Sequence, residues 1–163
     1  MEIKRPRIAL YEPRIPQNTG CIGRTCLAFN LSLDIIKPIG FSMEDKYLKR
    51  AGLDYWKYVD LHLYDSFEKY LEKFKNSRLI GLTKKTRKDI STIEFKESDI
   101  LLFGREDTGL PDLVMSQCEI LASIPMPGGE RYNKHGAVRS LNLSVACGIA
   151  SFTACAQLDL LSN

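Results

Sequence analysis

The chain has 163 residues, of which 44% are hydrophobic and 26% are charged, and its formal net charge is +3. A chain of this length and composition buries a core of its own, which excludes a disordered protein and a scaffold that depends on disulfides. We therefore expect one domain spanning residues 1–163. The small positive charge alone is a weak argument for a nucleic acid partner.

The five cysteines are odd in number, none forms a C-x-x-C pair, and neither histidine stands at metal-ligand spacing from one. We expect reduced, mostly buried cysteines and no metal site. Residues 1–10 lack the apolar segment and cleavage site of a signal peptide. The most apolar stretch, residues 145–156, is shorter than the ~18 to 20 residues of a membrane crossing, so we expect a cytoplasmic protein without a membrane partner.

Short β-branched or leucine-rich runs alternate with helical patterns along the chain. The predicted strands are residues 8–11, 33–36, 61–64, 79–82, 100–103 and 120–124. The predicted helices are residues 18–29, 43–51, 66–74, 111–117 and 141–160. This alternation is typical of an α/β domain with a mostly parallel sheet flanked by helices, in which ligands bind beyond the carboxyl ends of the strands.

The first helix opens with the pattern N-x-G-x-x-x-R, formed by Asn18, Gly20 and Arg24. Asn18 is expected to cap the helix, and Gly20 and Gly23 allow a backbone or a ligand to approach closely. Arg24 falls within the first two turns, near the preceding loop. A capped helix with a surface arginine is the purely structural alternative.

The fifth predicted strand ends in GREDTGLP, residues 104–111. Gly104 ends the strand where the backbone must be bare, and Gly109 permits a positive φ before a helix whose first position suits Pro111. Glu106 is expected to face the same crevice as Arg24, with which it could pair. The alternative is a turn with exposed charges.

The last predicted helix starts at SLNLS, residues 140–144, where Ser140, Asn142 and Ser144 supply more polar groups than capping requires. The chain contains neither the G-x-G-x-x-G fingerprint nor the G-x-x-x-x-G-K-[ST] phosphate loop, so the usual nucleotide-binding sites are not supported.

Taken together, N-T-G-x-x-x-R, L-F-G-x-E-x-x-G-L-P, I-P-M and S-L-N-L-S resemble the SpoU branch of the SPOUT superfamily. Members of this branch are S-adenosylmethionine-dependent RNA ribose 2′-O-methyltransferases with a C-terminal trefoil knot. LYEPRIPQNTGCIGR and KRAGLDYW are most similar to the TrmL-like group, which methylates the wobble nucleotide, cytidine or uridine, of certain tRNAs. The resemblance implies tRNA as partner, no metal, and a homodimer whose active sites are shared between subunits.

The resemblance also implies roles for particular residues. The cofactor-binding residues would be Leu82, Thr83, Gly104, Glu106, Ile124, Met126, Ser140 and Leu141. The catalytic residues would be Asn18, Arg24, Glu106 and Asn142. Because a guanidinium is permanently protonated, we expect Arg24 to grip a phosphate and orient the 2′-hydroxyl rather than act as a base, while Glu106 fastens the loop.

Basic residues gather near the same loops, and solvated surface is the alternative to an RNA contact. The predicted RNA-binding residues are Arg24, Lys84, Lys85, Arg87, Arg131, Lys134 and Arg139. Residues 127–139 are longer than is usual in the TrmL-like group and could reach RNA, cover the cofactor or alter substrate choice. Methylation of ribosomal RNA or of another tRNA position, and a noncatalytic RNA-binding domain, remain alternatives.

Overall fold

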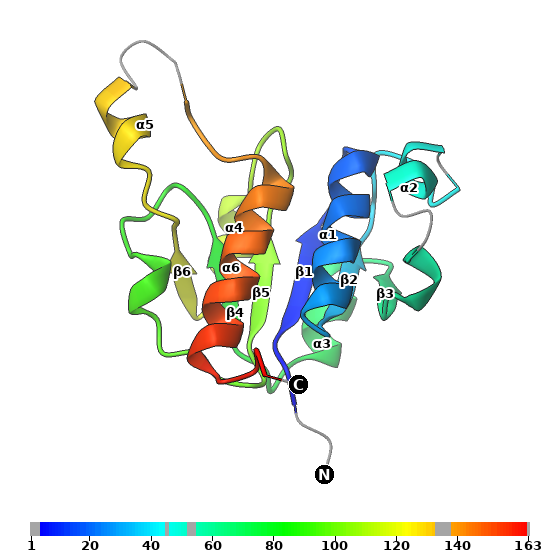
Figure 1. The fold of residues 1–163 in the computed structure, drawn as a ribbon, viewed down its shortest axis with the longest axis horizontal. Coiled ribbons are helices and arrows are strands. Elements are labelled where there is room, and N and C mark those ends of the chain that lie inside the picture. The colour runs from blue at the N-terminus through cyan, green and yellow to red at the C-terminus, as the bar shows by residue number, and fades with distance from the viewer. Residues whose placement is uncertain (1–3, 45, 52–54, 133–137, 163) are drawn as a thin grey trace.

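The computed structural model describes residues 4–44, 46–51, 55–132 and 138–162. Its centre is a 6-stranded sheet with the order β3-β2-β1-β5-β4-β6, in which every neighbouring pair is parallel (Figure 1). The strands are β1 (Arg7–Tyr11), β2 (Ser32–Ile36), β3 (Leu61–Tyr64), β4 (Leu79–Leu82), β5 (Ile100–Phe103) and β6 (Ile120–Ala122). The predicted α/β fold with a parallel sheet is confirmed. β6 ends two residues earlier than predicted, which leaves Ile124 in the following loop.

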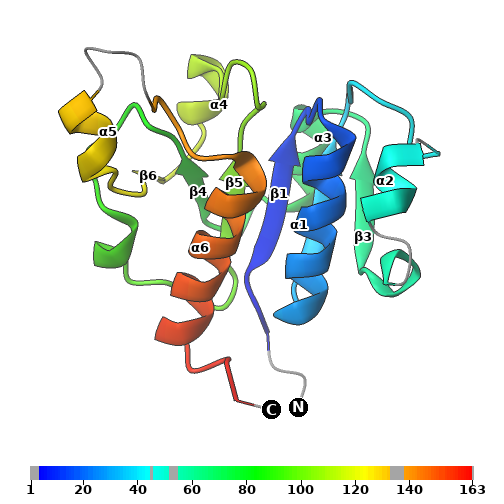
Figure 2. The ribbon, with the colours of Figure 1, turned by 45° about the horizontal axis from the view of Figure 1, so that its top comes forward.

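Helices cover both faces of the sheet (Figures 1 and 2). The long helices α1 (Pro16–Ala28) and α6 (Leu143–Gln157) pack side by side on one face, and α3 (Phe67–Lys73) and α4 (Asp112–Met115) pack on the other. The remaining helices are α2 (Lys46–Ala51), α5 (Pro127–Tyr132) and the 3₁₀ helices η1 (Trp56–Tyr58) and η2 (Ile90–Thr92). No helix of the described residues is long and apolar enough to cross a bilayer.

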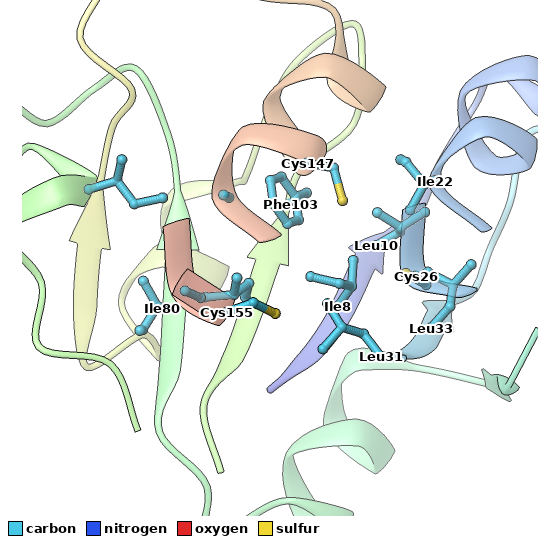
Figure 3. Close-up of a cluster of buried hydrophobic side chains, with 14 of the residues drawn as sticks. Ile8, Leu10, Ile22, Cys26, Leu31, Leu33, Ile80, Phe103, Cys147 and Cys155 are labelled. Carbon is cyan, nitrogen blue, oxygen red and sulfur yellow. The ribbon is translucent and has the colours of Figure 1, made fainter. Parts of the chain in front are cut away.

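The larger hydrophobic core lies between the sheet and the pair α1 and α6 (Figure 3). Alternation along the strands divides the side chains, because Ile8 and Leu10 face this core whereas Ala9 faces α3 and α4. Cysteines fill part of this core as small apolar residues. All five cysteines are free; Cys26, Cys147 and Cys155 are buried, Cys118 is partly buried and Cys21 is exposed.

The helix starts differ in part from the sequence prediction. Ser66 caps α3 as predicted, since its Oγ accepts a hydrogen bond of 3.2 Å from the Lys69 N–H. The predicted cap at Asn18 is wrong: α1 begins at Pro16, so Asn18 lies inside the first turn. Pro111 is the residue before α4 rather than its first position. A proline fits either place, because neither requires its missing N–H.

The connection between β4 and β5, residues 83–99, wraps around the end of β6 and reaches the end of α6. The Thr83 N–H donates to the Ala122 carbonyl over 2.9 Å. Further along, the Gln157 side chain of α6 donates to the Ile93 carbonyl over 2.6 Å. An ion pair of 2.7 Å between the partly buried Arg78 and the buried Asp99 closes the base of this connection. The connection therefore joins the carboxyl edge of the sheet to the C-terminal helix.

Candidate active site

A cavity of about 480 Å³ opens at the carboxyl ends of β4, β5 and β6, beside the starts of α1 and α6. This volume lies in the range of small-molecule pockets, about 300–1,000 Å³. Each of the residues predicted to bind a cofactor lines it: Leu82, Thr83, Gly104, Glu106, Ile124, Met126, Ser140 and Leu141. Segments far apart in the sequence thus meet at one edge of the sheet. Their role in holding a cofactor stays a prediction.

The loop after β5 forms one wall of the cavity and is built around its two glycines. A Cβ on Gly104 would lie 2.2 Å from both the Gly109 carbonyl carbon and the Leu110 nitrogen, so this position requires glycine. Gly109 has the predicted positive φ, 70°. Reciprocal backbone hydrogen bonds between Arg105 and Gly109, of 3.2 and 2.8 Å, close the loop. The result is a compact turn of bare backbone.

Glu106 fastens this turn to the loop after β1. Its Oε2 accepts a hydrogen bond of 2.8 Å from the Arg14 N–H, and its Oε1 accepts one of 3.0 Å from the Ile15 N–H. The Asn18 side-chain amide lies 3.5 Å from the same Oε1. Within one chain, backbone amides hold the carboxylate, rather than Arg24, with which the sequence analysis allowed it to pair.

Asn142 links the last helix to the first. It is the N-cap of α6, and its Oδ1 accepts hydrogen bonds from the Ser144 N–H and hydroxyl, of 2.9 and 2.6 Å. Its Nδ2 then points away from Ser144 and donates a hydrogen bond of 3.1 Å to Asn18 Oδ1. The amide of Asn18 is oriented in turn toward Glu106. One directed chain of hydrogen bonds thus joins α6, α1 and the loop after β5.

Charged residues that the sequence analysis did not select form the outer rim of the same turn. Arg105 donates two hydrogen bonds, of 3.0 and 2.8 Å, to the Asp107 carboxylate, and these bonds lower the pKa of Asp107 to about 2. Glu12, whose φ of 46° is left-handed, lies 3.8 Å from Arg105. Ile15, Arg105 and Asp107 also line the cavity. The sequence could have indicated these residues, because Arg105 and Asp107 flank Glu106, and Glu12 and Ile15 belong to the loop after β1.

Arg24 lies outside this cavity within a single chain. It is exposed on α1, and its Cζ lies 5.4 Å from the centroid of the Tyr55 ring. The cavity-lining residues include no histidine or cysteine. Of the carboxylates that line it, Glu106 accepts hydrogen bonds from backbone N–H groups and Asp107 accepts them from Arg105, so within the described chain the arrangement is suited to binding and orienting a molecule.

Four of the seven predicted RNA-binding cations line cavities. Lys84 and Lys85 line the first cavity, and Lys85 also pairs with Asp112 at 3.5 Å. Lys84, Arg87 and Arg139 line a second cavity of about 790 Å³, which shares part of its wall with the first.

Two of the predicted cations cannot be placed further. Arg131 lies in α5, and Lys134 lies outside the described residues. No group of metal-ligating side chains that could hold an ion occurs in the part of the chain that the structure describes.

Comparisons with known proteins agree with this geometry. The model of the SpoU rRNA Methylase family matches residues 5–152. The tRNA (cytidine(34)-2'-O)-methyltransferase of Methylovorus glucosotrophus (strain SIP3-4) is 39% identical over 154 residues, which cover 93% of this chain and 95% of that protein. A solved structure described as "Structural insights into the 2-OH methylation of C/U34 on tRNA" has a TM-score of 0.87 and 41% identity, and covers 97% of this chain and 99% of that chain.

A more distant solved structure supports the fold alone. The SpoU Methyltransferase AviRb from Streptomyces viridochromogenes, in complex with the cofactor AdoMet, has a TM-score of 0.84 at 20% identity, and covers 98% of this chain and 62% of that chain. The family model spans most of the chain, and a relative at 39% identity covers nearly all of it. The chain therefore belongs to the SpoU rRNA Methylase family.

Proposed function

We propose that the chain is an S-adenosylmethionine-dependent RNA ribose 2′-O-methyltransferase that acts on nucleotide 34, the wobble cytidine or uridine, of tRNA. The relatives named above carry this activity in their descriptions and match nearly the whole chain. The observation that carries the proposal is the cavity in which the loops after β4, β5 and β6 meet the start of α6. A tRNA substrate implies the cytoplasm as the place of action, and residues 1–163 would act as one domain.

The residues of the cavity fit this cofactor. The bare backbone of Gly104 allows close approach, and Leu82, Ile124, Met126 and Leu141 offer apolar surface to an adenosyl group. Glu106 contributes a carboxylate to the cavity lining, which would favour a cationic cofactor. When bound, the cofactor supplies a methyl group on a sulfonium, which is already an activated leaving group. The chain's own contribution is then alignment, which can be worth about 7–11 kcal/mol of the barrier in ideal cases.

The hydrogen-bond chain from Asn142 through Asn18 to Glu106 supports this alignment. It holds the starts of α1 and α6 and the loop after β5 in one geometry. Glu106 keeps the role of fastening that the sequence analysis gave it. Arg24 would grip the phosphate beside the target ribose and steer the 2′-hydroxyl, because a guanidinium has no readily lost proton.

A homodimer would bring Arg24 to the cavity of the other subunit. One face of α6 exposes Val145, Ile149 and Phe152, which are 50%, 38% and 54% exposed and recur at helical spacing. A Cβ on Gly148, on the same face, would meet no atom within 4 Å. An exposed apolar stripe with room for a neighbouring helix favours a second copy of this chain as the partner.

A C-terminal trefoil knot is the finer part of the proposed fold. Support comes from the connection of residues 83–99, which wraps the end of β6 and is hydrogen-bonded to Gln157 at the end of α6. The chain that leaves β6 would pass through this connection before it forms α6.

For RNA, we propose that Lys84, Lys85, Arg87 and Arg139 contact backbone phosphate, together with Arg131 and Lys134. The two adjoining cavities, which share Lys84, would form a continuous basic surface. The target ribose would lie over the first cavity, and flanking phosphates would lie over the second.

The test is mass spectrometry of nucleosides from tRNA incubated with the purified chain and S-adenosylmethionine. We expect a new ribose methyl group at nucleotide 34, and we expect Arg24→Lys to lose most turnover because lysine lacks the planar fork. A methyl group on ribosomal RNA or at another tRNA position would favour the alternative that the family's rRNA description raises. No methyl group on any RNA would favour a noncatalytic RNA-binding domain.

A further inference from the structure

The residue proposed to steer the substrate is an exposed arginine, and such a side chain has many rotamers. To steer the substrate, the side chain must be held in one rotamer. The structure gives Arg24 a specific neighbour, the ring of Tyr55, whose centroid lies 5.4 Å from Cζ. This distance is within the range of a cation–π interaction, about 6 Å. Tyr55 belongs to the segment that includes η1, which lies 31 positions beyond Arg24 in the sequence.

Tyr55 is itself held against α1. Its hydroxyl donates a hydrogen bond of 3.3 Å to the Gly20 carbonyl, one helical turn before Arg24. The next residue, Trp56, lies on Gly23, where a Cβ would come within 2.4 and 2.9 Å of its indole ring. This aromatic segment therefore docks on α1 at two glycines: the Gly20 carbonyl accepts the hydrogen bond of Tyr55, and Gly23 leaves room for the ring of Trp56. The docking fixes the ring of Tyr55 relative to the backbone that carries Arg24.

The chemistry of this contact suits a phosphate ligand. A carboxylate that held Arg24 would occupy the guanidinium N–H groups that a phosphate needs. A ring that meets the cation through its π face leaves the N–H groups at the edge of the guanidinium available. The contact can therefore restrict the side chain without using the donors that the substrate would bind.

We infer that Tyr55 is a positioning residue, which orients the guanidinium of Arg24 toward an RNA phosphate. This inference rests on the proposed function, in which Arg24 grips the phosphate next to the target ribose. Tyr55 would act through Arg24 and would not touch the cofactor, since it is absent from the residues that line the first cavity.

The experiment measures kcat and KM for tRNA, and the Kd for S-adenosylmethionine, in variants of the full chain. Tyr55→Phe keeps the ring and the docking of Trp56 on Gly23 but loses the hydrogen bond to the Gly20 carbonyl, so it should lose less activity than Tyr55→Leu. Tyr55→Leu removes the ring and should lower kcat/KM by about tenfold to a hundredfold, the scale of a small misplacement, with the cofactor Kd unchanged. Tyr58→Leu is the matched control, because Tyr58 is 64% exposed and its ring lies 5.0 Å from Lys57 rather than near Arg24.

A double-variant cycle separates positioning from a general structural effect. If Tyr55 acts through Arg24, adding Tyr55→Leu to Arg24→Gln should cause little further loss. Progressively fluorinated phenylalanines at position 55 keep the shape of the ring and weaken its π face, so activity should fall with each step even if Tyr55→Leu does not fold. The inference would be overturned if the fold-loss in kcat/KM of the double variant equals the product of the two single losses. It would also be overturned if activity does not change with the number of fluorine atoms.

The outcome for the proposed function can be read separately. An inactive wild-type chain removes the proposed function and the inference with it. An active wild type whose Arg24→Gln variant has normal turnover leaves the methyltransferase function standing but overturns the role of Arg24, and with it the inference. An active wild type with an impaired Arg24→Gln variant and a normal Tyr55→Leu variant overturns the inference alone. An equal loss in Tyr55→Leu and Tyr58→Leu also overturns it, because the effect would then not be specific to Arg24.

Discussion

The side-chain amide of Asn142 donates a hydrogen bond of 3.1 Å to the Oδ1 of Asn18, across 124 positions of sequence. Asn142 serves two purposes at once, because its oxygen caps α6 while its nitrogen reaches α1. The cap and the cross-link can therefore be separated by a change in one atom.

Asn142→Asp should keep the cap and lose the cross-link. Its carboxylate still accepts from the Ser144 N–H, whereas the oxygen that replaces Nδ2 faces the oxygen of Asn18. Thermal stability should change little, and methylation should fall by about tenfold or more, as expected for a misplaced polar frame. Asn142→Ala, which loses both functions, should also lose about 1 kcal/mol of stability. Normal turnover in the aspartate variant would contradict a role for the cross-link in catalysis.

Gly104→Ala should distort the cavity wall. The new Cβ would lie 2.2 Å from backbone atoms of the same turn, so the loop must move at a cost of about 1–3 kcal/mol. We expect weaker binding of S-adenosylmethionine by isothermal titration calorimetry and a lower melting temperature. Gly128→Ala is the control, because a Cβ there meets no atom within 4 Å. Equal behaviour of the two variants would refute this account of the loop.

Neutralising the basic surface should change how tRNA binding depends on salt. Replacing Lys84, Lys85 or Arg87 by glutamine should reduce the slope of log K against log salt by about 1 for each phosphate that the side chain binds. Filter binding of tRNA between low and moderate salt measures this slope. Lys75→Gln serves as control, since Lys75 is an exposed cation in the turn before β4, at the opposite edge of the sheet. A slope that stays the same in the triple glutamine variant would rule out binding of phosphate by these side chains.

The exposed stripe on α6 gives a test of the dimer. Phe152→Glu should turn a dimer into a monomer in light scattering, because a charge on an apolar interface loses its solvation. Leu113→Glu is the control, since Leu113 is 76% exposed on α4, away from the stripe. If sites are shared, a mixture of Arg24→Gln and Gly104→Ala chains should recover activity that neither has alone. A mixture that stays inactive argues against sharing.

Buried thiols should make the chain sensitive to alkali. Burial raises the pKa of Cys147 to about 12 and that of Cys118 to about 11, from an ordinary value of 9.0. The unfolded chain therefore releases these protons first, so the contribution of these two thiols to the free energy of unfolding should be constant below about pH 9 and fall as pH rises toward 11 and 12. Guanidinium midpoints at a series of pH values measure the decline. Cys118→Ala and Cys147→Ala should make it shallower, and an undiminished decline would exclude the thiols as its cause.

Much of the fold could be predicted because its signals are local. Buried strands are short apolar runs, and five of the six predicted strands match to within one residue. The sequence does not predict α5, because its residues, PGGERY, include two glycines that usually mark a turn. Asn18 suits a cap by its residue type, although Pro16 is the stronger signal for the start of α1.

The site was predictable as a set of loops but not as a set of partners. The rule that ligands bind at the carboxyl ends of parallel strands identified the segments that line the cavity. The sequence left the partner of Glu106 open between Arg24 and groups of the motifs, because hydrogen bonds from backbone amides, such as those of Arg14 and Ile15, cannot be recognised from residue types. The contact of Arg24 with Tyr55 depends on how α1 and η1 dock, which no spacing along the chain encodes.

The connection of residues 83–99 contributes Thr83 to the wall of the cavity and the Ile93 carbonyl to the end of α6. The start of the connection therefore lines the cavity, while its middle holds the C-terminal helix. We therefore expect a ligand that immobilises Thr83 to restrain the Ile93 segment as well, which would link occupation of the cavity to anchoring of the C-terminal helix.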